Sequence, residues 1–276
     1  MIANLWLNGI TTLSMAISPI IIPSKNSNKF SNKSDFLQWS YKLYSTKLFP
    51  VVDNNSKLNP NFVTGFADGE STFGVFVDKN SALNLGWRIR AKFRIELHIR
   101  DIELLYAIKH FFNGVGHIRL ITTRDLVAYE VERKEELINV VIPHFIKYPL
   151  ISQKAADFEL FKLAVEMIKN KEHLTKEGLL KIINIKASLN KGLSEDLKKA
   201  FPNYESVLKS DVILPDQLSP YWITGFITGE GCFTISKSTS QFRARLVITQ
   251  HSRDLQLFPR PGSLNFEFSK CRPGFN

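Results

Sequence analysis

The stretch "NFVTGFADGE", residues 61–70, decides the fold because the chain repeats it as "YWITGFITGE" at residues 221–230. Each copy directly follows a polar residue and a proline, a pairing typical of the start of a helix. Each copy also holds an internal glycine, Gly65 or Gly225, which lowers helix propensity by about 1 kcal/mol. Close approach of two backbones can compensate this loss. The repeat therefore predicts two short helices packed together, with Gly65 and Gly225 at their interface.

The same arrangement places two glutamates side by side, Glu70 and Glu230, at the C-terminal ends of the helices. The negative end of a helix disfavours a carboxylate, and so does a second carboxylate nearby. A lone glutamate at such a position is usually only solvated. A matched pair favours a Mg²⁺ site, because this ion prefers oxygen ligands and can activate water. Glu70 and Glu230 are therefore the expected metal ligands and catalytic residues.

Each helix is followed by two strands, and the second of these strands has one basic face. In "RIRAKFRIELH", residues 88–98, basic and apolar residues alternate, and "QFRARLVITQH", residues 241–251, repeats the beginning of this pattern. With a net charge of +10, the chain is expected to bind a polyanion, and arginine and glutamine can read base edges. The residues expected to face DNA are Arg88, Arg90, Lys92, Arg94, Gln241, Arg243 and Arg245, together with Thr72, Gly74, Phe76, Asp78, Thr234, Ser236 and Ser238 from the strands that directly follow the helices.

The chain between the two copies continues the first unit. A helix is expected at "LLYAIKHFF", then strands at residues 116–121 and 126–132, then further helices. Residues 1–24 carry no charged side chain, but polar residues and a proline interrupt them, so they make a poor membrane span. Two cysteines are too few for a disulfide framework or a four-cysteine zinc site.

The two "TGF..GE" helices, each followed by a basic hairpin, resemble the LAGLIDADG homing endonucleases of the single-chain, two-motif type. "YPLISQK" and the stretch that begins "KEHLTKEG" resemble fungal organellar members. The resemblance implies an α+β fold, in which two pseudo-symmetric αββαββα halves form a DNA-binding saddle. It implies Mg²⁺-dependent cleavage of double-stranded DNA by a monomer made in the mitochondrion, without a small-molecule substrate. The family's acidic metal ligand falls on Glu70 and Glu230. Thr228 departs from the family's usual acid, which Asp68 keeps in the first copy.

The resemblance also divides the chain. Residues 1–58 are expected to be an N-terminal extension, either exon-derived or disordered. The expected first domain spans residues 59–170, a helical linker spans 171–218, and a second domain begins at 219–258. The tail, 259–276, contains prolines where a helix should start and shows no second pair of strands. An incomplete second half would leave a strand edge and an apolar face uncovered, so we expect low stability and feeble or no cleavage.

Three other functions compete with a homing endonuclease. The same basic sheet would serve an RNA-binding maturase that assists splicing of an intron. The chain could also be a decayed fragment that binds DNA without cleaving it, or a helix-paired structural protein without any ligand. Titration with a divalent metal separates the structural protein from the others, and an assay of duplex DNA cleavage separates the endonuclease.

Overall fold

The computed structural model describes residues 58–237, 242–250, 254 and 257, which all belong to one compact unit. The predictions for the N-terminal extension and for the tail fall outside these residues, as do those for Ser238 and Gln241. Within the part of the chain that is described, no helix has the length and apolar character needed to cross a membrane.

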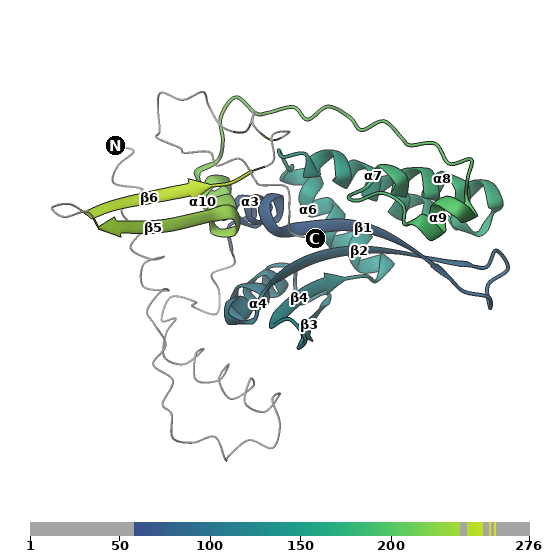
Figure 1. Cartoon of the computed structure of the whole chain (residues 1–276), viewed down its shortest axis with the longest axis horizontal. Coiled ribbons are helices and arrows are strands. Elements are labelled where there is room, and N and C mark those ends of the chain that lie inside the picture. The colour runs from purple at the N-terminus through teal and green to yellow at the C-terminus, as the bar shows by residue number, and fades with distance from the viewer. Residues whose placement is uncertain (1–57, 238–241, 251–253, 255–256, 258–276) are drawn as a thin grey trace, which may run out of the picture. The chain divides into compact units, whose positions relative to one another are not determined.

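The first half has the predicted succession of helices and strands (Figure 1). Its main elements are α3 (Pro60–Glu70), β1 (Ser71–Lys79), β2 (Trp87–His98), α4 (Ile102–Phe111), β3 (His117–Ile121), β4 (Leu126–Val131), α6 (Ile142–Lys147) and α7 (Lys154–Lys169). Shorter helical turns lie at Ile99–Asp101, Lys134–Glu136 (α5), Leu137–Val141 and Glu172–Leu174. Then come α8 (Lys176–Ser188), α9 (Glu195–Ala200), α10 (Pro220–Glu230), β5 (Gly231–Lys237) and β6 (Phe242–Ile248). The α+β prediction is confirmed.

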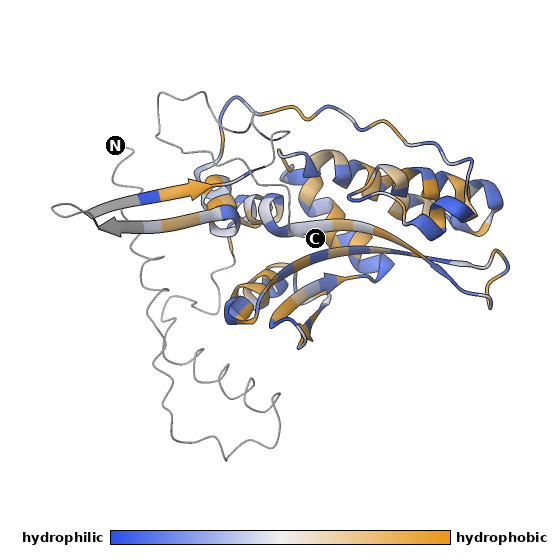
Figure 2. Ribbon diagram, viewed as in Figure 1, coloured by the Kyte–Doolittle hydropathy of each residue, from blue (hydrophilic) through white to orange (hydrophobic). Residues whose placement is uncertain are grey.

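The four strands of the first half form an antiparallel sheet in the order β1-β2-β4-β3. The register places Thr72 opposite Arg94 and Arg94 opposite Glu130, so these three residues share one face. The other face is apolar, and Phe73 and Phe93 on it are 1% and 0% exposed. Hydrophobic and hydrophilic residues alternate along β2, as the sequence pattern predicts (Figure 2).

Helices pack on the apolar face of this sheet through aromatic side chains. The ring centroid of Phe73 lies 5.2 Å from that of Phe145 on α6 and 5.3 Å from that of Phe158 on α7. Both pairs are edge-to-face, an arrangement that aromatic quadrupoles favour. Val63 and Phe66 of α3 belong to the same core, so the sheet and its helices fix the position of α3.

The helices α3 and α10 pack against each other at their glycines. A methyl group added at Gly65 would lie 2.0 Å from the carbonyl oxygen of Trp222, and one added at Gly225 would lie 2.1 Å from that of Phe62. The contacts are reciprocal, as expected for a pseudo-twofold axis. Each glycine faces a carbonyl of the other helix rather than the opposite glycine, so only a residue without Cβ fits at either position.

His144 on α6 lies buried beneath α3. Its Nε2 is 3.1 Å from Thr64 Oγ1, and that hydroxyl donates to the carbonyl oxygen of Tyr148 at 3.0 Å. Because the threonine proton goes to Tyr148, Nε2 must carry a proton and donate to Thr64. The rings of Phe111 and Phe112 stand edge-on to the imidazole. Burial lowers the pKa of His144 from 6.5 to about 4, so the ring is neutral in the folded chain at pH 7.

We expect the stability of the chain to fall as the pH falls, partly through His144. Its pKa of about 4 in the folded chain lies below the ordinary 6.5, so between these values the unfolded chain binds the extra proton. The shift should remove about 2 kcal/mol of unfolding free energy between pH 7 and pH 4.5. Urea unfolding of wild type and His144→Gln at both pH values measures it. An identical loss in the variant would exclude His144 as a cause.

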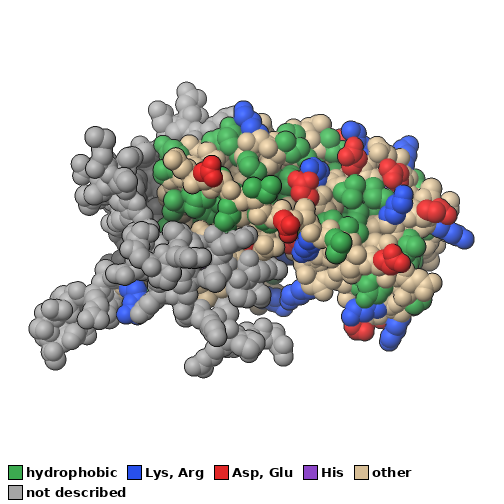
Figure 3. Space-filling model, turned by 90° about the horizontal axis from the view of Figure 1, so that it is seen from above, with side chains coloured by type: hydrophobic (Ala, Val, Ile, Leu, Met, Phe, Trp, Pro, Cys, Tyr) green, Lys and Arg blue, Asp and Glu red, His purple; other side chains and the backbone are tan. Residues whose placement is uncertain are grey.

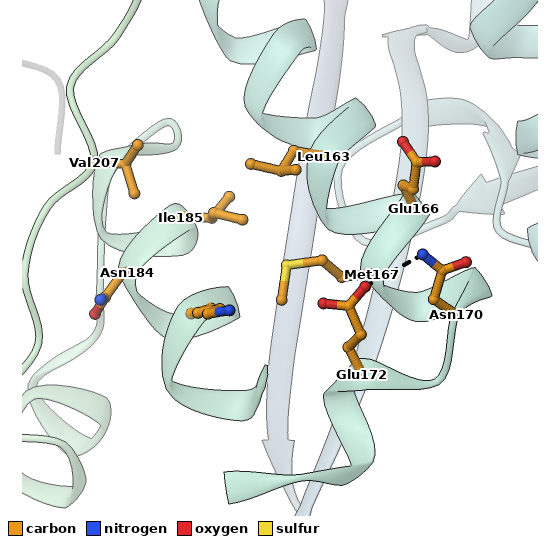
Figure 4. Close-up of a pocket in the computed structure, with 9 residues that line it drawn as sticks. Leu163, Glu166, Met167, Asn170, Glu172, Asn184, Ile185 and Val207 are labelled. Atoms are coloured by element: carbon orange, nitrogen blue, oxygen red, sulfur yellow. Dashed lines mark hydrogen bonds between the residues drawn. The ribbon is translucent and has the colours of Figure 1, made fainter. Parts of the chain in front are cut away.

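A cavity of about 420 Å³ opens on the helical side of the molecule, between α7, α8 and the segment that follows α9 (Figure 4). Apolar and charged side chains line it together, among them Leu163, Met167, Ile185, Val207, Glu166 and Lys181. None of its lining residues belongs to the predicted metal or DNA sites. The face of the molecule in Figure 3 likewise mixes basic and acidic side chains among hydrophobic ones.

Candidate metal centre and nucleic-acid interface

The two predicted metal ligands lie at the ends of the paired helices, since α3 ends at Glu70 and α10 ends at Glu230. A methyl group added at Gly69 would come 3.0 Å from Glu230 Cγ, and one added at Gly229 would come 3.0 Å from Glu70 Cγ. Each glutamate side chain therefore crosses to the glycine of the other helix. The structure brings the two side chains into one site.

The surroundings of Glu70 and Glu230 disfavour the ionised form of each carboxyl group. Burial raises the pKa of Glu70, the carboxylate of Glu230 raises it further, and Lys154 acts in the opposite direction. Burial also raises the pKa of Glu230, against a hydrogen bond with Gln250 and the charge of Lys154. These carboxylates therefore favour a bound proton or cation. A divalent cation would remove the repulsion between them, which is the electrostatic reason to consider a metal here.

Lys154, the first residue of α7, is a component of the site that the residue patterns did not single out. Its Nζ donates to the carbonyl oxygens of Ala67 and Gly69 in the last turn of α3, to the former at 3.3 Å. Burial lowers the pKa of Lys154, while the surrounding carboxylates, led by Asp68 and Glu230, oppose the shift. The ammonium thus offsets the negative end of the helix that carries Glu70. The stretch "YPLISQK", which ends on Lys154, is the part of the sequence that pointed to this residue.

The buried carboxylate of Asp68 is held by hydrogen bonds from the surrounding scaffold. Its Oδ1 accepts from the backbone and the hydroxyl of Ser152 at 3.1 and 2.6 Å. Its Oδ2 accepts from the Ile151 backbone at 3.1 Å and from Trp222 Nε1 at 2.8 Å. Burial raises the pKa of Asp68, although these donors oppose the shift. The carboxylate therefore ties α3 to α10 and to the turn before α7. Thr228, its counterpart, donates within its own helix to the carbonyl oxygen of Thr224 at 2.8 Å.

The two carboxylates fit a hard divalent cation that takes its remaining ligands from water and from the substrate. In the described stretches, no group of three or more His, Cys, Asp or Glu residues is placed to hold a metal ion. Two carboxylates suffice for Mg²⁺, which usually keeps several waters and takes one or two carboxylates together with substrate phosphates. The pair of Glu70 and Glu230 is thus compatible with a cation shared between the protein and a phosphodiester.

The polar face of the first sheet is less purely basic than the sequence pattern suggested. Arg90 pairs with Asp78 at 2.7 Å and with Glu132 at 3.0 Å. Lys92 pairs with Glu130 at 3.4 Å and with Glu132 at 3.5 Å. These pairs form because Asp78 on β1, Glu130 on β4 and Glu132 just after β4 lie on the same face as the cations of β2. The alternation in "LVAYEVE", which puts Glu130 and Glu132 on one face, was the signal for the two glutamates.

The structure places the remaining predicted DNA-facing residues of the first half along the same face. Thr72, Phe76 and Arg88 are exposed, whereas Arg90, Lys92, Arg94 and Asp78 are half-buried and Gly74 is buried. Lys92 Nζ and the guanidinium carbon of Arg90 lie 5.7 and 6.0 Å from the centroid of the Phe76 ring, within cation–π range. An exposed aromatic ring framed by cations can contact a sugar or a base.

The second hairpin has the same construction. β5 and β6 pair antiparallel, with Thr234 opposite Arg245 and Ser236 opposite Arg243 in the register. Thr234 and Arg245 therefore share one face of the hairpin. Thr234 and Arg245 are exposed. Ile248, on the other parity of β6, is 3% exposed and packs in a small core with Trp222 and Phe226.

Comparisons with known proteins agree with this geometry. A family model described as "LAGLIDADG endonuclease" matches residues 63–165 and 223–260. "Probable intron-encoded endonuclease 3" of Neurospora crassa is 44% identical over 212 residues, covering 76% of this chain and 38% of that protein. This chain thus spans well under half of that curated relative's length.

Solved structures of I-SmaMI are similar as well. The structure of this LAGLIDADG homing endonuclease bound to cleaved DNA is 41% identical, with a TM-score of 0.67 over 73% of this chain and 69% of that chain. I-SmaMI bound to an uncleaved DNA target in the presence of calcium ions gives 41% identity and a TM-score of 0.68, covering 73% of this chain and 70% of that one. The family match extends over both glycine-bearing helices and the strands that follow them. The chain belongs to the LAGLIDADG endonuclease family.

Proposed function

We propose that this chain is a site-specific endonuclease that hydrolyses both strands of a DNA duplex with a divalent cation held by Glu70 and Glu230. The observation that carries the proposal is the meeting of these two glutamates at the ends of reciprocally packed helices. Burial raises the pKa of both glutamates, and the charge of Glu230 raises that of Glu70 further, which supports a bound cation between them. The proposal covers the activity, the substrate and the cation, for which Mg²⁺ is the expected choice.

In this mechanism the protein holds the reacting groups and keeps the carboxylates in place. The cation would supply activation of a water and stabilisation of the leaving oxygen. Glu70 and Glu230 would hold it in their ionised forms, one from each half of the chain. Lys154 fixes the carbonyl end of α3 through its bonds to Ala67 and Gly69, and its charge limits the repulsion at the site.

The two hairpins would hold the duplex through their polar faces. Lysine and arginine contacts to phosphates supply affinity, and side chains that reach base edges supply sequence preference. One chain provides both helices and both glutamates, so we propose that a monomer is the active form. The name of the Neurospora crassa relative, which calls it intron-encoded, is in keeping with the predicted origin in a fungal mitochondrial intron. Binding to intron RNA stays a hypothesis.

Selection of a cleavage site from a pool of randomised duplexes tests the proposal. The full chain is incubated with the pool and Mg²⁺, and the new ends are sequenced. We expect one recurrent sequence, cut in both strands only when the divalent cation is present. No enrichment in Mg²⁺ or Mn²⁺ would contradict the proposed activity. Binding without cleavage would favour the non-catalytic alternative, and preferential binding of structured RNA would favour the maturase.

A further inference from the structure

Glu130 occupies an unusual position on the polar face of the first sheet. It lies on β4 and is 2% exposed, although the basic side chains around it are half-buried or exposed. Its carboxylate receives cationic groups from both neighbouring strands. Arg119 Nη2 on β3 lies 3.0 Å from Oε1, and Lys92 Nζ and Arg94 Nε on β2 lie 3.4 and 3.3 Å from its oxygens. His117 Nε2 approaches to 3.4 Å.

The buried carboxylate is ionised because of these neighbours. Burial alone would raise the pKa of Glu130, but Arg119 and Lys92 together hold it below its ordinary value. A buried anion with several charge-assisted partners fixes their geometry, and removing it leaves those cations uncompensated. Glu130 therefore links two strands of the polar face through side chains as well as through backbone pairing.

The cations differ in how far they depend on Glu130. Arg94 also pairs with Glu96, and Lys92 also pairs with Glu132 at 3.5 Å. Arg119, whose side chain is 48% exposed, has no second acidic partner among the described residues. A phosphate that approached Arg119 would have to compete with Glu130 for the guanidinium. The Glu130 carboxylate thus forms the ion pair with Arg119 that a phosphate group of DNA would otherwise form.

We propose that Glu130 is a positioning residue that restrains Arg119, Lys92 and Arg94, so that the first sheet binds arbitrary DNA weakly and reads its own target selectively. The inference rests on the proposed function and assigns a source of its selectivity. Cations that are already satisfied gain little from a phosphate, because phosphate contacts depend on free positive charge. A guanidinium held in one orientation can still present its remaining N–H groups to a base edge.

The test is the salt dependence of binding to a duplex of unrelated sequence, measured by fluorescence anisotropy between about 50 and 200 mM salt. Glu130→Gln keeps the size of the side chain and removes its charge. We expect its log–log slope to be steeper than that of wild type by about 1 to 2, because each new phosphate contact adds about 0.9. The ratio of affinities for the selected target and the unrelated duplex should fall by about tenfold, roughly the discrimination of one base contact.

Glu132→Gln is the matched control. It removes the same charge two residues further along the chain, but each of its two cations keeps another acid: Arg90 keeps Asp78, and Lys92 keeps Glu130. We expect a change in slope of less than about 0.5, since no phosphate contact is gained. Equal slopes in the two variants would overturn the inference, because net charge alone would then explain the effect. A wild-type slope and wild-type selectivity in Glu130→Gln would overturn it too.

Arg119→Gln gives an answer that does not depend on the folding of the Glu130 variant. Its side chain is about half exposed, and Lys92 and Arg94 would still compensate the Glu130 carboxylate, so the fold should persist. If Glu130 holds Arg119 away from phosphates, the variant should lose selectivity for the target and keep the wild-type slope on unrelated DNA. A slope lower by about 0.9 would show that Arg119 already contacts a phosphate, and would contradict the inference. A wild-type chain that binds no duplex at all would instead refute the proposed function, and this inference with it.

Discussion

Gly65→Ala is expected to separate the two helices and to unfold the second half of the chain first. The added methyl group would lie 2.0 Å from the carbonyl oxygen of Trp222, and no rotamer change can relieve a contact with backbone. Any shift of α10 also breaks the buried hydrogen bond from Trp222 Nε1 to Asp68. Overpacking and the loss of a hydrogen bond to a buried carboxyl group together should lower the unfolding free energy by at least about 3 kcal/mol.

Urea unfolding of the full chain measures this effect, with Gly69→Ala as the matched control in the same helix. A methyl group at Gly69 would meet the flexible Glu230 side chain at 3.0 Å, which can move by a few tenths of an ångström. The better helix propensity of alanine, about 1 kcal/mol, should offset this contact. Gly225→Ala should match Gly65→Ala, because its methyl group would meet the carbonyl oxygen of Phe62 at 2.1 Å. Wild-type stability in both variants would refute the close packing of the helices.

Glu70→Gln and Glu230→Gln should each reduce cleavage of the selected duplex by about a thousandfold or more. A metal ion contributes several kcal/mol to the transition state, and each 1.36 kcal/mol corresponds to a tenfold change in rate. Binding of the duplex should persist, because glutamine removes a negative charge next to the phosphates. The measurement is single-turnover cleavage at saturating protein, beside the affinity for the duplex in Ca²⁺.

Glu103→Gln serves as the control for the loss of a carboxylate. Glu103 lies on α4 and, like the paired glutamates, has a pKa that burial raises. It has no part in the proposed metal site, so its variant should cleave at the wild-type rate. Undiminished cleavage in either Glu70→Gln or Glu230→Gln would rule out the shared metal centre.

The sequence was sufficient for those features that depend on local periodicity and on the repeat. The proline, the glycine and the final glutamate of each copy predicted both helices and the meeting of Glu70 with Glu230. Alternation of residue types predicted the two faces of β2. These features could be read because helices and strands impose fixed spacings on a sequence.

Other features depend on contacts that no local pattern encodes. Lys154 reaches the end of α3 from 85 positions away, and Glu130 meets Lys92 from 38 positions away. Which side chains meet then depends on sheet order and on the turn before α7. For this reason, the sequence patterns identified neither Lys154 nor the acids that pair with the cations of β2. The four donors around Asp68 come from two distant segments and could not be identified either.

Calorimetric titration of the protein–duplex complex with Ca²⁺ tests the shared metal centre most directly, and the matched comparison is the Glu70→Gln/Glu230→Gln double variant. We predict that the wild-type complex binds the cation and that its affinity falls as the pH falls, because the raised pKa values of both glutamates let protons compete with the cation. The double variant should lose this binding. Equal binding by wild type and double variant would contradict the account.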